Sequence, residues 1–218
     1  MKVAAFLFDL DGTLVDTEAL WSRAIVDFVN DRGGRAELGE VLELVVGRSW
    51  IDIDVALHDR YPTIGKSTPM EDAVDLRVYY NRYATDPEAL KIPGSIAFFH
   101  AVAALAPCAI VSGSPHDDVV AAAKLCGIEN ELALVLGAGE YAAGKPSPSG
   151  YLRAAELLKV DPSACVVIED STAGVASGVA AGMKVIALDR EVLVKSDFKG
   201  ETWRVKDLAE IDVKKEFA

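Results

Sequence analysis

Short runs of hydrophobic residues recur along the chain and predict the strands of a buried parallel sheet. The first run, residues 3–8, is unbroken and ends at Asp9. Further runs alternate with stretches of helical length in the second half of the chain, at residues 108–111, 132–136, 165–168 and 185–188. Periodicity alone would also allow a helix at residues 3–8. The alternation favours successive β-α-β units, and we predict an α/β fold with a doubly wound, mainly parallel, Rossmann-like sheet.

Residues 17–89 have a different pattern, which predicts an inserted helical domain. Apolar side chains recur at helical spacing from Trp21 to Val29, and Gly33-Gly34 ends that helix. Residues 68–71 combine a capping threonine, a proline at the first helical position and a glutamate at the third. No strand-like apolar run occurs within residues 17–89. The expected domains are a core formed by residues 1–16 and 90–218 and a helical insert formed by residues 17–89.

Composition restricts the classes of partner. The chain has 218 residues, enough for one substantial core and an accessory domain. Its 22 Lys and Arg residues stand against 34 Asp and Glu residues, a net charge of -12. Such a surface repels nucleic acid and anionic lipid, so we expect neither a nucleic-acid partner nor a membrane partner. A phosphate site would therefore need a metal ion and a few well-aimed donors.

The cysteines and apolar runs indicate the cellular setting. Cys108, Cys126 and Cys165 are odd in number, lie in apolar stretches and form no CxxC pair, which argues against a disulfide framework or a cysteine zinc site. The longest later apolar run, residues 101–111, contains a proline and is too short to span a membrane. We expect a soluble cytoplasmic protein without a targeting segment. The sequence contains no indication of its oligomeric state.

Two carboxylates follow the first predicted strand, Asp9 and Asp11. Open α/β sheets bind ligands at this end of their strands. If the extended conformation continues through Asp11, both side chains project to the same side. One carboxylate can then attack phosphorus while the other transfers a proton. A solvated Asp-Gly turn explains the isolated motif equally well.

Polar residues also follow two later strands. Ser112 and Gly113 come directly before a predicted helix, so a hydroxyl and free backbone N–H groups can bind an anion there. Glu169 and Asp170 offer hard oxygen ligands to Mg²⁺. Each segment taken alone is more often a helix cap.

Lys145 lies in a segment that imitates the GxxxxGK pattern of nucleotide-binding P-loops. Pro146 occupies the position where that pattern needs a Ser or Thr hydroxyl for magnesium, and the segment does not connect a first strand to its helix. We therefore reject a P-loop. Lys145 remains suited to neutralising phosphate charge, with a solvated surface lysine as the alternative.

Together these segments resemble the signature of the haloacid dehalogenase superfamily. The matching residues are Asp9-Leu10-Asp11-Gly12-Thr13, Ser112, Gly144-Lys145-Pro146 and Glu169-Asp170-Ser171. A helical cap inserted after the first motif is similar to that of the β-phosphoglucomutase and sugar-phosphate phosphatase subfamily. The resemblance covers nearly the whole core and implies a phosphatase acting on a small phosphorylated metabolite.

The resemblance also implies a role for each matching residue. Asp9 would be the nucleophile and Asp11 the general acid and then base. Ser112, Gly113 and Lys145 would bind phosphate. The cofactor would be Mg²⁺, held by Asp9, the backbone carbonyl of Asp11, and Asp170, with Glu169 as a further candidate.

Single residues distinguish the related enzymes. Haloacid dehalogenases and phosphonatases lack the second aspartate, so Asp11 argues against both, and the cap offers only Lys66 for the Schiff base of a phosphonatase. A β-phosphoglucomutase carries a histidine shortly after the first motif, where this chain has Trp21. The mutase is therefore the second candidate. A non-catalytic binding protein on the same fold is a third, although every catalytic carboxylate is present.

The cap should select the substrate. Gly47-Arg48-Ser49 resembles the substrate loop of such caps, and Arg48 could contact the leaving group or be a surface arginine. Weaker candidates are Trp21, Trp50 and Arg77, since aromatic residues at helical spacing more often belong to a core. The three histidines, His58, His100 and His116, are not spaced as a metal set, and we assign them no role.

Overall fold

The computed structural model describes residues 2–45, 48, 50–86, 88–190 and 197–217. It contains two compact units. One combines Met1–Val15 with Lys91–Ala218 and holds the sheet, and we call it the core unit. The other, Asp16–Leu90, is helical, and we call it the cap unit.

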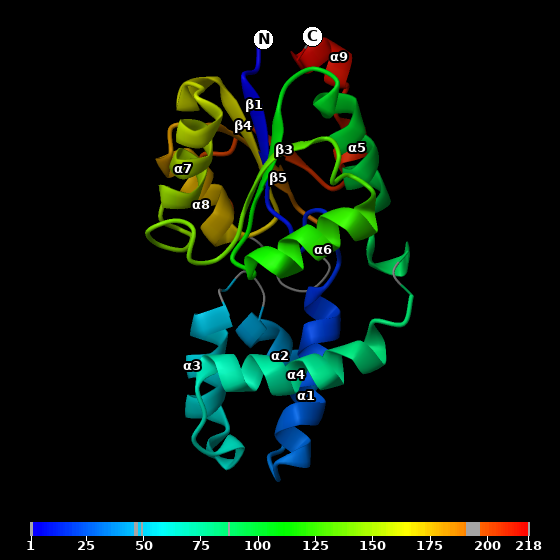
Figure 1. Cartoon of the computed structure of the whole chain (residues 1–218), viewed down its shortest axis with the longest axis vertical. Coiled ribbons are helices and arrows are strands. Elements are labelled where there is room, and N and C mark those ends of the chain that lie inside the picture. The colour runs from blue at the N-terminus through cyan, green and yellow to red at the C-terminus, as the bar shows by residue number, and fades with distance from the viewer. Residues whose placement is uncertain (1, 46–47, 49, 87, 191–196, 218) are drawn as a thin grey trace. The chain divides into compact units, whose positions relative to one another are not determined.

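A parallel sheet of six strands forms the centre of the core unit, which confirms the predicted α/β fold (Figure 1). The strand order is β3-β2-β1-β4-β5-β6, so β1 lies in the interior of the sheet. The strands are β1 (Ala5–Phe8), β2 (Cys108–Val111), β3 (Leu132–Leu136), β4 (Cys165–Glu169), β5 (Lys184–Leu188) and β6 (Trp203–Val205). The first five match the predicted apolar runs, whereas the short edge strand β6 was not predicted.

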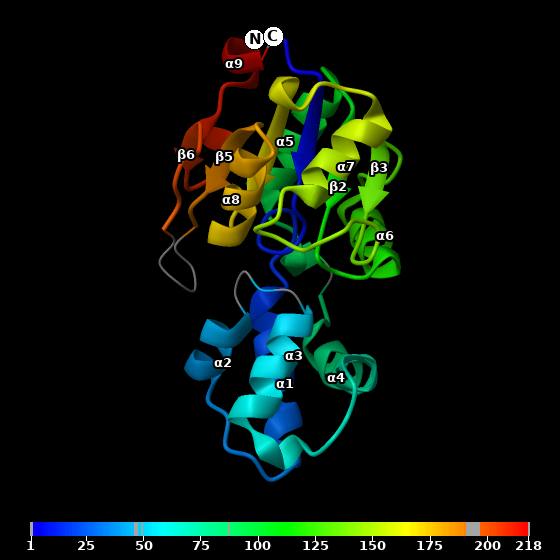
Figure 2. The same ribbon diagram turned by 90° about the vertical axis from the view of Figure 1, so that its left-hand side faces the viewer.

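Helices cover both faces of the sheet (Figures 1 and 2). Phe6 and Phe8 of β1 point to one face and pack with apolar side chains of α5 and α6. Leu7 points to the other face and packs with side chains of α7 and α8. The helices of this unit are α5 (Pro93–Ala103), α6 (His116–Cys126), α7 (Ser149–Leu158), α8 (Thr172–Ala180) and α9 (Val213–Phe217), with 3-10 turns η3 (Pro162–Ala164) and η4 (Leu208–Glu210). Burial on both faces explains why β1 and β2 are wholly apolar and why β4 is apolar up to its last residue, Glu169.

The parallel register brings three strand ends together. Phe8, the last residue of β1, is paired with Ile110 of β2 and with Ile168 of β4. The residues that follow these three central strands therefore lie close together, at the edge of the sheet formed by the carboxyl ends of its strands. This carboxyl edge is where the candidate catalytic residues lie.

The cap unit has a hydrophobic core of its own. Apolar side chains of α1, including Ile25 and Phe28, pack with Val41, Leu57 and Leu76 of the other cap helices. The helices are α1 (Glu18–Asp31), α2 (Leu38–Val45), α3 (Trp50–Arg60) and α4 (Pro69–Tyr83), with 3-10 turns η1 (Pro62–Ile64) and η2 (Glu88–Leu90). The two helix signals read from the sequence are confirmed in α1 and in α4.

Side chains at the start of α4 accept hydrogen bonds from backbone N–H groups of the first helical turn. The Thr68 hydroxyl accepts a hydrogen bond from the Glu71 backbone N–H, and the Glu71 carboxylate accepts one from the Thr68 backbone N–H. Pro69 follows the cap residue, where its missing N–H costs nothing.

All three cysteines are free and buried, as expected from their apolar surroundings. No helix within the described ranges is both long enough and apolar enough to cross a membrane.

Candidate active site

Asp9 and Lys145 form an ion pair at the carboxyl edge of the sheet. Lys145 Nζ lies 2.5 Å from Asp9 Oδ1 and 2.5 Å from Glu169 Oε1. The Asp9 backbone N–H donates to the Ile168 carbonyl, which holds the residue against the end of β4. Asp9 and Glu169 are both buried, and the Lys145 side chain is 16% exposed. One ammonium therefore bridges two carboxylates from neighbouring strands.

The pKa values of both Asp9 and Lys145 are raised, for different reasons. Burial raises the pKa of Asp9 to about 8, the Lys145 ammonium opposes that rise, and the Glu169 carboxylate adds to it. Burial alone would lower the pKa of Lys145, but Asp9 and Glu169 together raise it well above its usual value. Lys145 thus remains a cation at neutral pH. A divalent cation near Asp9 would lower the pKa of that carboxyl and favour the nucleophilic carboxylate.

Glu169 is held by protein donors on both of its oxygens. Tyr151 Oη donates to Oε1 at 2.7 Å, on the same oxygen that meets Lys145. Oε2 accepts from the Ser171 hydroxyl at 3.1 Å and from the backbone N–H groups of Asp170 and Ser171. A Cβ added to Gly174 would lie 1.8 Å from the Glu169 carboxyl carbon, so this glycine makes room for the carboxylate. To bind a metal directly, Glu169 would have to give up one of these bonds.

Asp11 is oriented by the segment that follows β2. Ser114 Oγ donates to Asp11 Oδ2 at 2.8 Å, and the Ser114 backbone N–H donates to Ser112 Oγ at 3.0 Å. The Tyr141 hydroxyl donates a hydrogen bond of 2.7 Å to the Ser112 carbonyl. Since β1 ends at Phe8, the two aspartates are presented by a turn and not by a continued strand.

Asp170 lies against that turn. Thr13 Oγ1 donates to Asp170 Oδ1 at 3.2 Å. Gly12 has a φ of +81°, and a Cβ at this position would stand 2.0 Å from Asp170 Oδ2. The glycine is therefore required both by the backbone conformation and by the carboxylate packed on it.

Three acidic side chains of the site fit a divalent cation. Asp9, Glu169 and Asp170 each offer a carboxylate oxygen, and these atoms lie within 4.8 Å of one another. Hard oxygen donors of this kind suit Mg²⁺. The close packing of Gly12 on Asp170 keeps the third carboxylate at this position.

The predicted phosphate-binding residues lie at the same edge. Ser112 is buried, and its hydroxyl accepts from Ser114, which leaves its own hydrogen able to donate. Gly113 is exposed, with open space where a Cβ would stand. Together with Lys145 these residues could supply a hydroxyl, the Gly113 backbone N–H and an ammonium to an anion, whereas the backbone N–H groups of Ser112 and Ser114 donate within the protein.

The candidates in the cap unit have other surroundings. Arg48 is exposed, while Gly47 and Ser49 of the same motif lie outside the described residues. Trp21 stacks on Tyr80 with ring centroids 4.2 Å apart, and Trp50 Nε1 donates to the Pro69 carbonyl at 2.8 Å. Both tryptophans thus pack within the cap unit. The role of Arg48 in substrate binding stays a prediction.

Sequence reasoning missed Ser114 and Tyr151. Ser114 is two residues beyond Ser112, in a segment already recognised as an anion loop, so its position was a usable signal. Tyr151 sits in the first turn of α7 and is fully buried, and only the structure shows that its hydroxyl meets Glu169.

Comparison with known proteins gives consistent results. Residues 3–182 match the profile of the haloacid dehalogenase-like hydrolases. The chain is 37% identical to hexitol phosphatase A of Escherichia coli over 87% of this chain and 84% of that protein. It is 31% identical to the β-phosphoglucomutase of Mycobacterium bovis over 85% of this chain and 80% of that protein. The crystal structure of CbbY from Rhodobacter sphaeroides in complex with xylulose-(1,5)bisphosphate has a TM-score of 0.81, with 22% identity and 96% of each chain covered.

Proposed function

Because the chain belongs to the haloacid dehalogenase-like hydrolases, we propose that it is a Mg²⁺-dependent phosphatase that forms an aspartyl-phosphate on Asp9. Its substrate is a small phosphorylated metabolite, a sugar phosphate or a related phosphate monoester. The observation that supports this most is the contact of the buried Asp9 carboxylate with the Lys145 ammonium, beside Asp170 and within the same turn as Asp11. The similarity to hexitol phosphatase A supports the substrate class.

The first half-reaction transfers the phosphoryl group to Asp9. An oxygen of the Asp9 carboxylate attacks phosphorus, the new O–P bond forms, and the bond from phosphorus to the leaving oxygen breaks. Asp11 donates its proton to that oxygen, so the alcohol leaves neutral. Ser114, which donates to Asp11 Oδ2, would hold the Asp11 carboxyl group in place for this proton transfer.

The second half-reaction releases phosphate. Asp11, now ionised, accepts a proton from water as the water oxygen attacks phosphorus, and the bond from phosphorus to Asp9 breaks. The net reaction consumes one water and yields an alcohol and inorganic phosphate. Asp9 and Asp11 return to their starting protonation states.

The charges of the site explain why a cation is needed. Asp9, Glu169 and Asp170 contribute three carboxylates, and Lys145 contributes one ammonium within hydrogen-bonding distance of Asp9 and Glu169. A phosphate dianion would be repelled by the remaining negative charge. Asp9, Asp170 and the Asp11 carbonyl would hold Mg²⁺, and this ion would neutralise charge on the phosphoryl oxygens. Lys145 and the Ser112-Gly113 loop would bind the remaining oxygens.

A β-phosphoglucomutase is the second candidate, favoured by the 31% identity to such an enzyme. Both reactions would share the phosphorylated Asp9 and differ only in whether water or a sugar hydroxyl attacks it. Trp21 replaces the histidine expected of a mutase, and its ring is engaged in stacking on Tyr80. We therefore favour water as the acceptor. The cap unit, through Arg48, would bind the leaving group and set the substrate choice.

The test is a panel of phosphorylated metabolites incubated with the purified full-length chain and Mg²⁺. Phosphorus NMR should show stoichiometric inorganic phosphate from a sugar or hexitol phosphate, with no isomerised ester and no requirement for a bisphosphate. Asp9→Asn should lose at least about 10²-fold in rate while remaining folded. Isomerisation with little free phosphate would favour the mutase. No turnover of any ester by the wild-type chain would favour a non-catalytic binding protein.

A further inference from the structure

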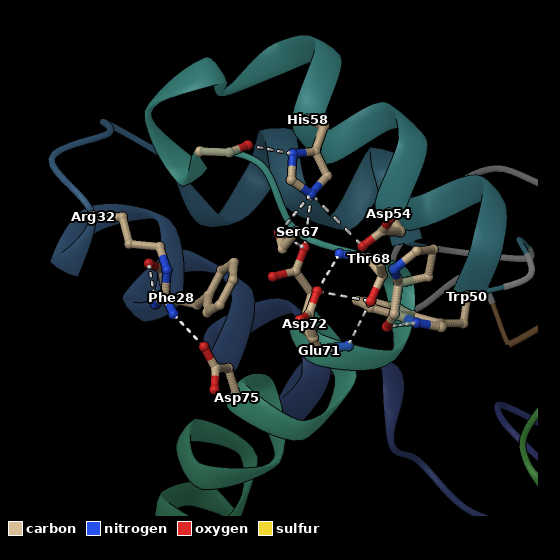
Figure 3. A network of polar contacts seen from close by, with 12 residues as sticks. Phe28, Arg32, Trp50, Asp54, His58, Ser67, Thr68, Glu71, Asp72 and Asp75 are labelled. Carbon is tan, nitrogen blue, oxygen red and sulfur yellow. Dashed lines mark hydrogen bonds and ion pairs between the residues drawn. The ribbon is translucent and has the colours of Figure 1, made fainter.

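A second cluster of metal-type ligands lies in the cap unit, between α3 and the start of α4 (Figure 3). His58 Nε2 is 2.7 Å from Asp72 Oδ2 and 4.0 Å from Asp54 Oδ1. Asp54 and His58 are one helical turn apart on α3, so both side chains project from one face of that helix. Each aspartate is only 4% exposed, whereas the His58 side chain is 24% exposed.

Asp54 is the first sign that this cluster is incomplete. Within the part of the chain that the structure describes, its buried Oδ1 has no hydrogen-bond partner. Figure 3 shows the Asp54 carboxylate directed toward the His58 ring. Burial and then the neighbouring Asp72 carboxylate raise the pKa of Asp54, while His58 opposes the rise. An unpartnered buried carboxylate oxygen is costly, and a bound cation is one group that would satisfy it.

The His58 ring is set in one orientation by the backbone. Its Nδ1 lies 3.1 Å from the Gly65 carbonyl oxygen, and because a carbonyl only accepts, Nδ1 must carry a hydrogen. In neutral imidazole the Nε2 lone pair then points at the Asp72 carboxylate. A backbone carbonyl on the outer nitrogen is the arrangement that commonly orients a metal-binding histidine.

Two acceptors 2.7 Å apart repel each other unless a proton between them, or a cation that both of them contact, removes the repulsion. A proton on Nε2 would satisfy Asp72, which already accepts from the Ser67 hydroxyl at 2.8 Å. It would leave Asp54 Oδ1 unsatisfied, because that atom is 4.0 Å from Nε2. A metal ion placed among the three atoms would satisfy all of them at once.

We propose that Asp54, His58 and Asp72 form a binding site for a divalent transition-metal ion of the Zn²⁺ class. One imidazole nitrogen and two carboxylate oxygens are donors that such ions accept, whereas Mg²⁺ prefers oxygen alone. With three protein ligands the fourth position would be taken by water, which can enter on the exposed side of His58. The ion would link α3 to α4, so its binding stabilises the folded cap unit. This site is independent of the phosphatase chemistry proposed above.

The experiment titrates the chelator-treated, full-length chain with Zn²⁺ alone. All proteins carry Asp170→Asn, which weakens binding of metal at the catalytic carboxylates. Equilibrium dialysis with elemental analysis counts bound zinc, and nitrogen NMR follows the ring of His58. We expect zinc binding that shifts the His58 Nε2 resonance and raises the thermal unfolding midpoint. Since loss of a supporting partner alone weakens a metal site by about 10 to 100-fold, His58→Gln should weaken it at least tenfold.

His100→Gln is the matched control. His100 Nδ1 also lies 2.7 Å from a carboxylate, Glu131, but that pair is exposed and, among the residues that the structure describes, belongs to no group of three metal-type ligands. This variant should bind zinc as the parent does. Asp54→Asn, which keeps the side-chain shape, provides a second variant should His58→Gln fail to fold. Zinc binding that neither His58→Gln nor Asp54→Asn weakens, or no shift of the His58 ring on adding zinc, would overturn the proposal.

Discussion

Ser114 Oγ donates a hydrogen bond of 2.8 Å to Asp11 Oδ2, joining two segments that are 103 residues apart in sequence. The bond crosses from the loop after β2 to the turn after β1. Ser114 also donates through its backbone to Ser112 Oγ. One residue therefore connects the proposed general acid to the proposed phosphate-binding loop.

Ser114→Ala should lower kcat about tenfold or more, with a smaller effect on KM. A hydrogen bond to a charged group contributes about 1.5–3 kcal/mol, and its loss would let the Asp11 carboxylate rotate away from the reacting oxygen. The measurement is steady-state kinetics on the ester identified by the panel. Ser163→Ala is the matched control, because Ser163 Oγ also donates to an aspartate, Asp161, at 2.8 Å, but on the exposed surface. Equal losses in both variants would remove Ser114 from the mechanism.

Gly12→Ala should reduce turnover by about a hundredfold or more, because the new Cβ would displace the Asp170 carboxylate by an ångström or so. Gly127 has a similar left-handed φ of +72° but open space around it. Gly127→Ala should therefore cost only about 1–2 kcal/mol of backbone strain and leave kcat unchanged. Kinetics and urea unfolding of the two variants separate the clash from the strain. Normal activity in folded Gly12→Ala would contradict the role given to Asp170.

Tyr151→Phe should lower the free energy of unfolding by about 1–3 kcal/mol, since the buried Glu169 carboxylate loses a donor that water cannot replace. Tyr83→Phe removes a hydroxyl with the same 2.7 Å contact to a carboxylate, Asp27, at a less buried position. Its cost should stay below about 1 kcal/mol. Chemical denaturation measures both. A Tyr151→Phe protein as stable as Tyr83→Phe would mean that Glu169 is satisfied without the tyrosine.

Chelation of divalent cations should abolish phosphate release, and Mg²⁺ should restore it. Ca²⁺ should restore it poorly, because its larger and looser coordination disturbs in-line transfer. Asp170→Asn should raise the Mg²⁺ concentration needed for half-maximal activity, whereas Asp197→Asn, which removes an exposed carboxylate paired with Lys199, should not. Activity that survives complete removal of metal would refute the cation requirement.

Cys108 should make stability fall in alkaline solution. Burial raises the pKa of its thiol from 9.0 to about 12. The folded state therefore retains a proton that the unfolded state loses above pH 9, so this contribution is complete below pH 9 and disappears as pH rises toward 12. For one such thiol the loss by pH 11 is about 2.7 kcal/mol. Urea unfolding between pH 8 and 11 should show a shallower decline for Cys108→Ala than for wild type, and parallel curves would contradict this account.

The sequence was sufficient for the features that depend on local pattern. Unbroken apolar runs located β1, β2 and β4 because these strands are buried on both faces. The capping residues at Thr68 and Pro69 located the start of α4. The edge strand β6 was missed because it has only three residues, alternates in exposure and has no apolar run.

Contacts between residues far apart in the sequence could not be predicted from the sequence. The Tyr151 hydroxyl could have met water, backbone or any acid, and only the packing of α7 on the sheet selects Glu169. The spacing of Asp54 and His58 along the sequence fits one face of a helix, but the third member, Asp72, comes from another helix, and no local pattern pairs it with them. Pairwise spacing within a helix, and not the count of one residue type, was the useful signal.

The interior position of β1 also determines the order in which the chain can be assembled during translation. The strand is synthesised first, yet its partners β2 and β4 are made only after the whole cap unit. The cap helices all lie within Asp16–Leu90 and pack with one another, so they can form before the strands that pair with β1 have been synthesised. In the nascent chain β1 thus has no partner strand until β2 has been synthesised, and it is paired on one side only until β4 has been synthesised. The core unit is the part most exposed to aggregation on the ribosome, and slow codons after the cap would prolong that exposure.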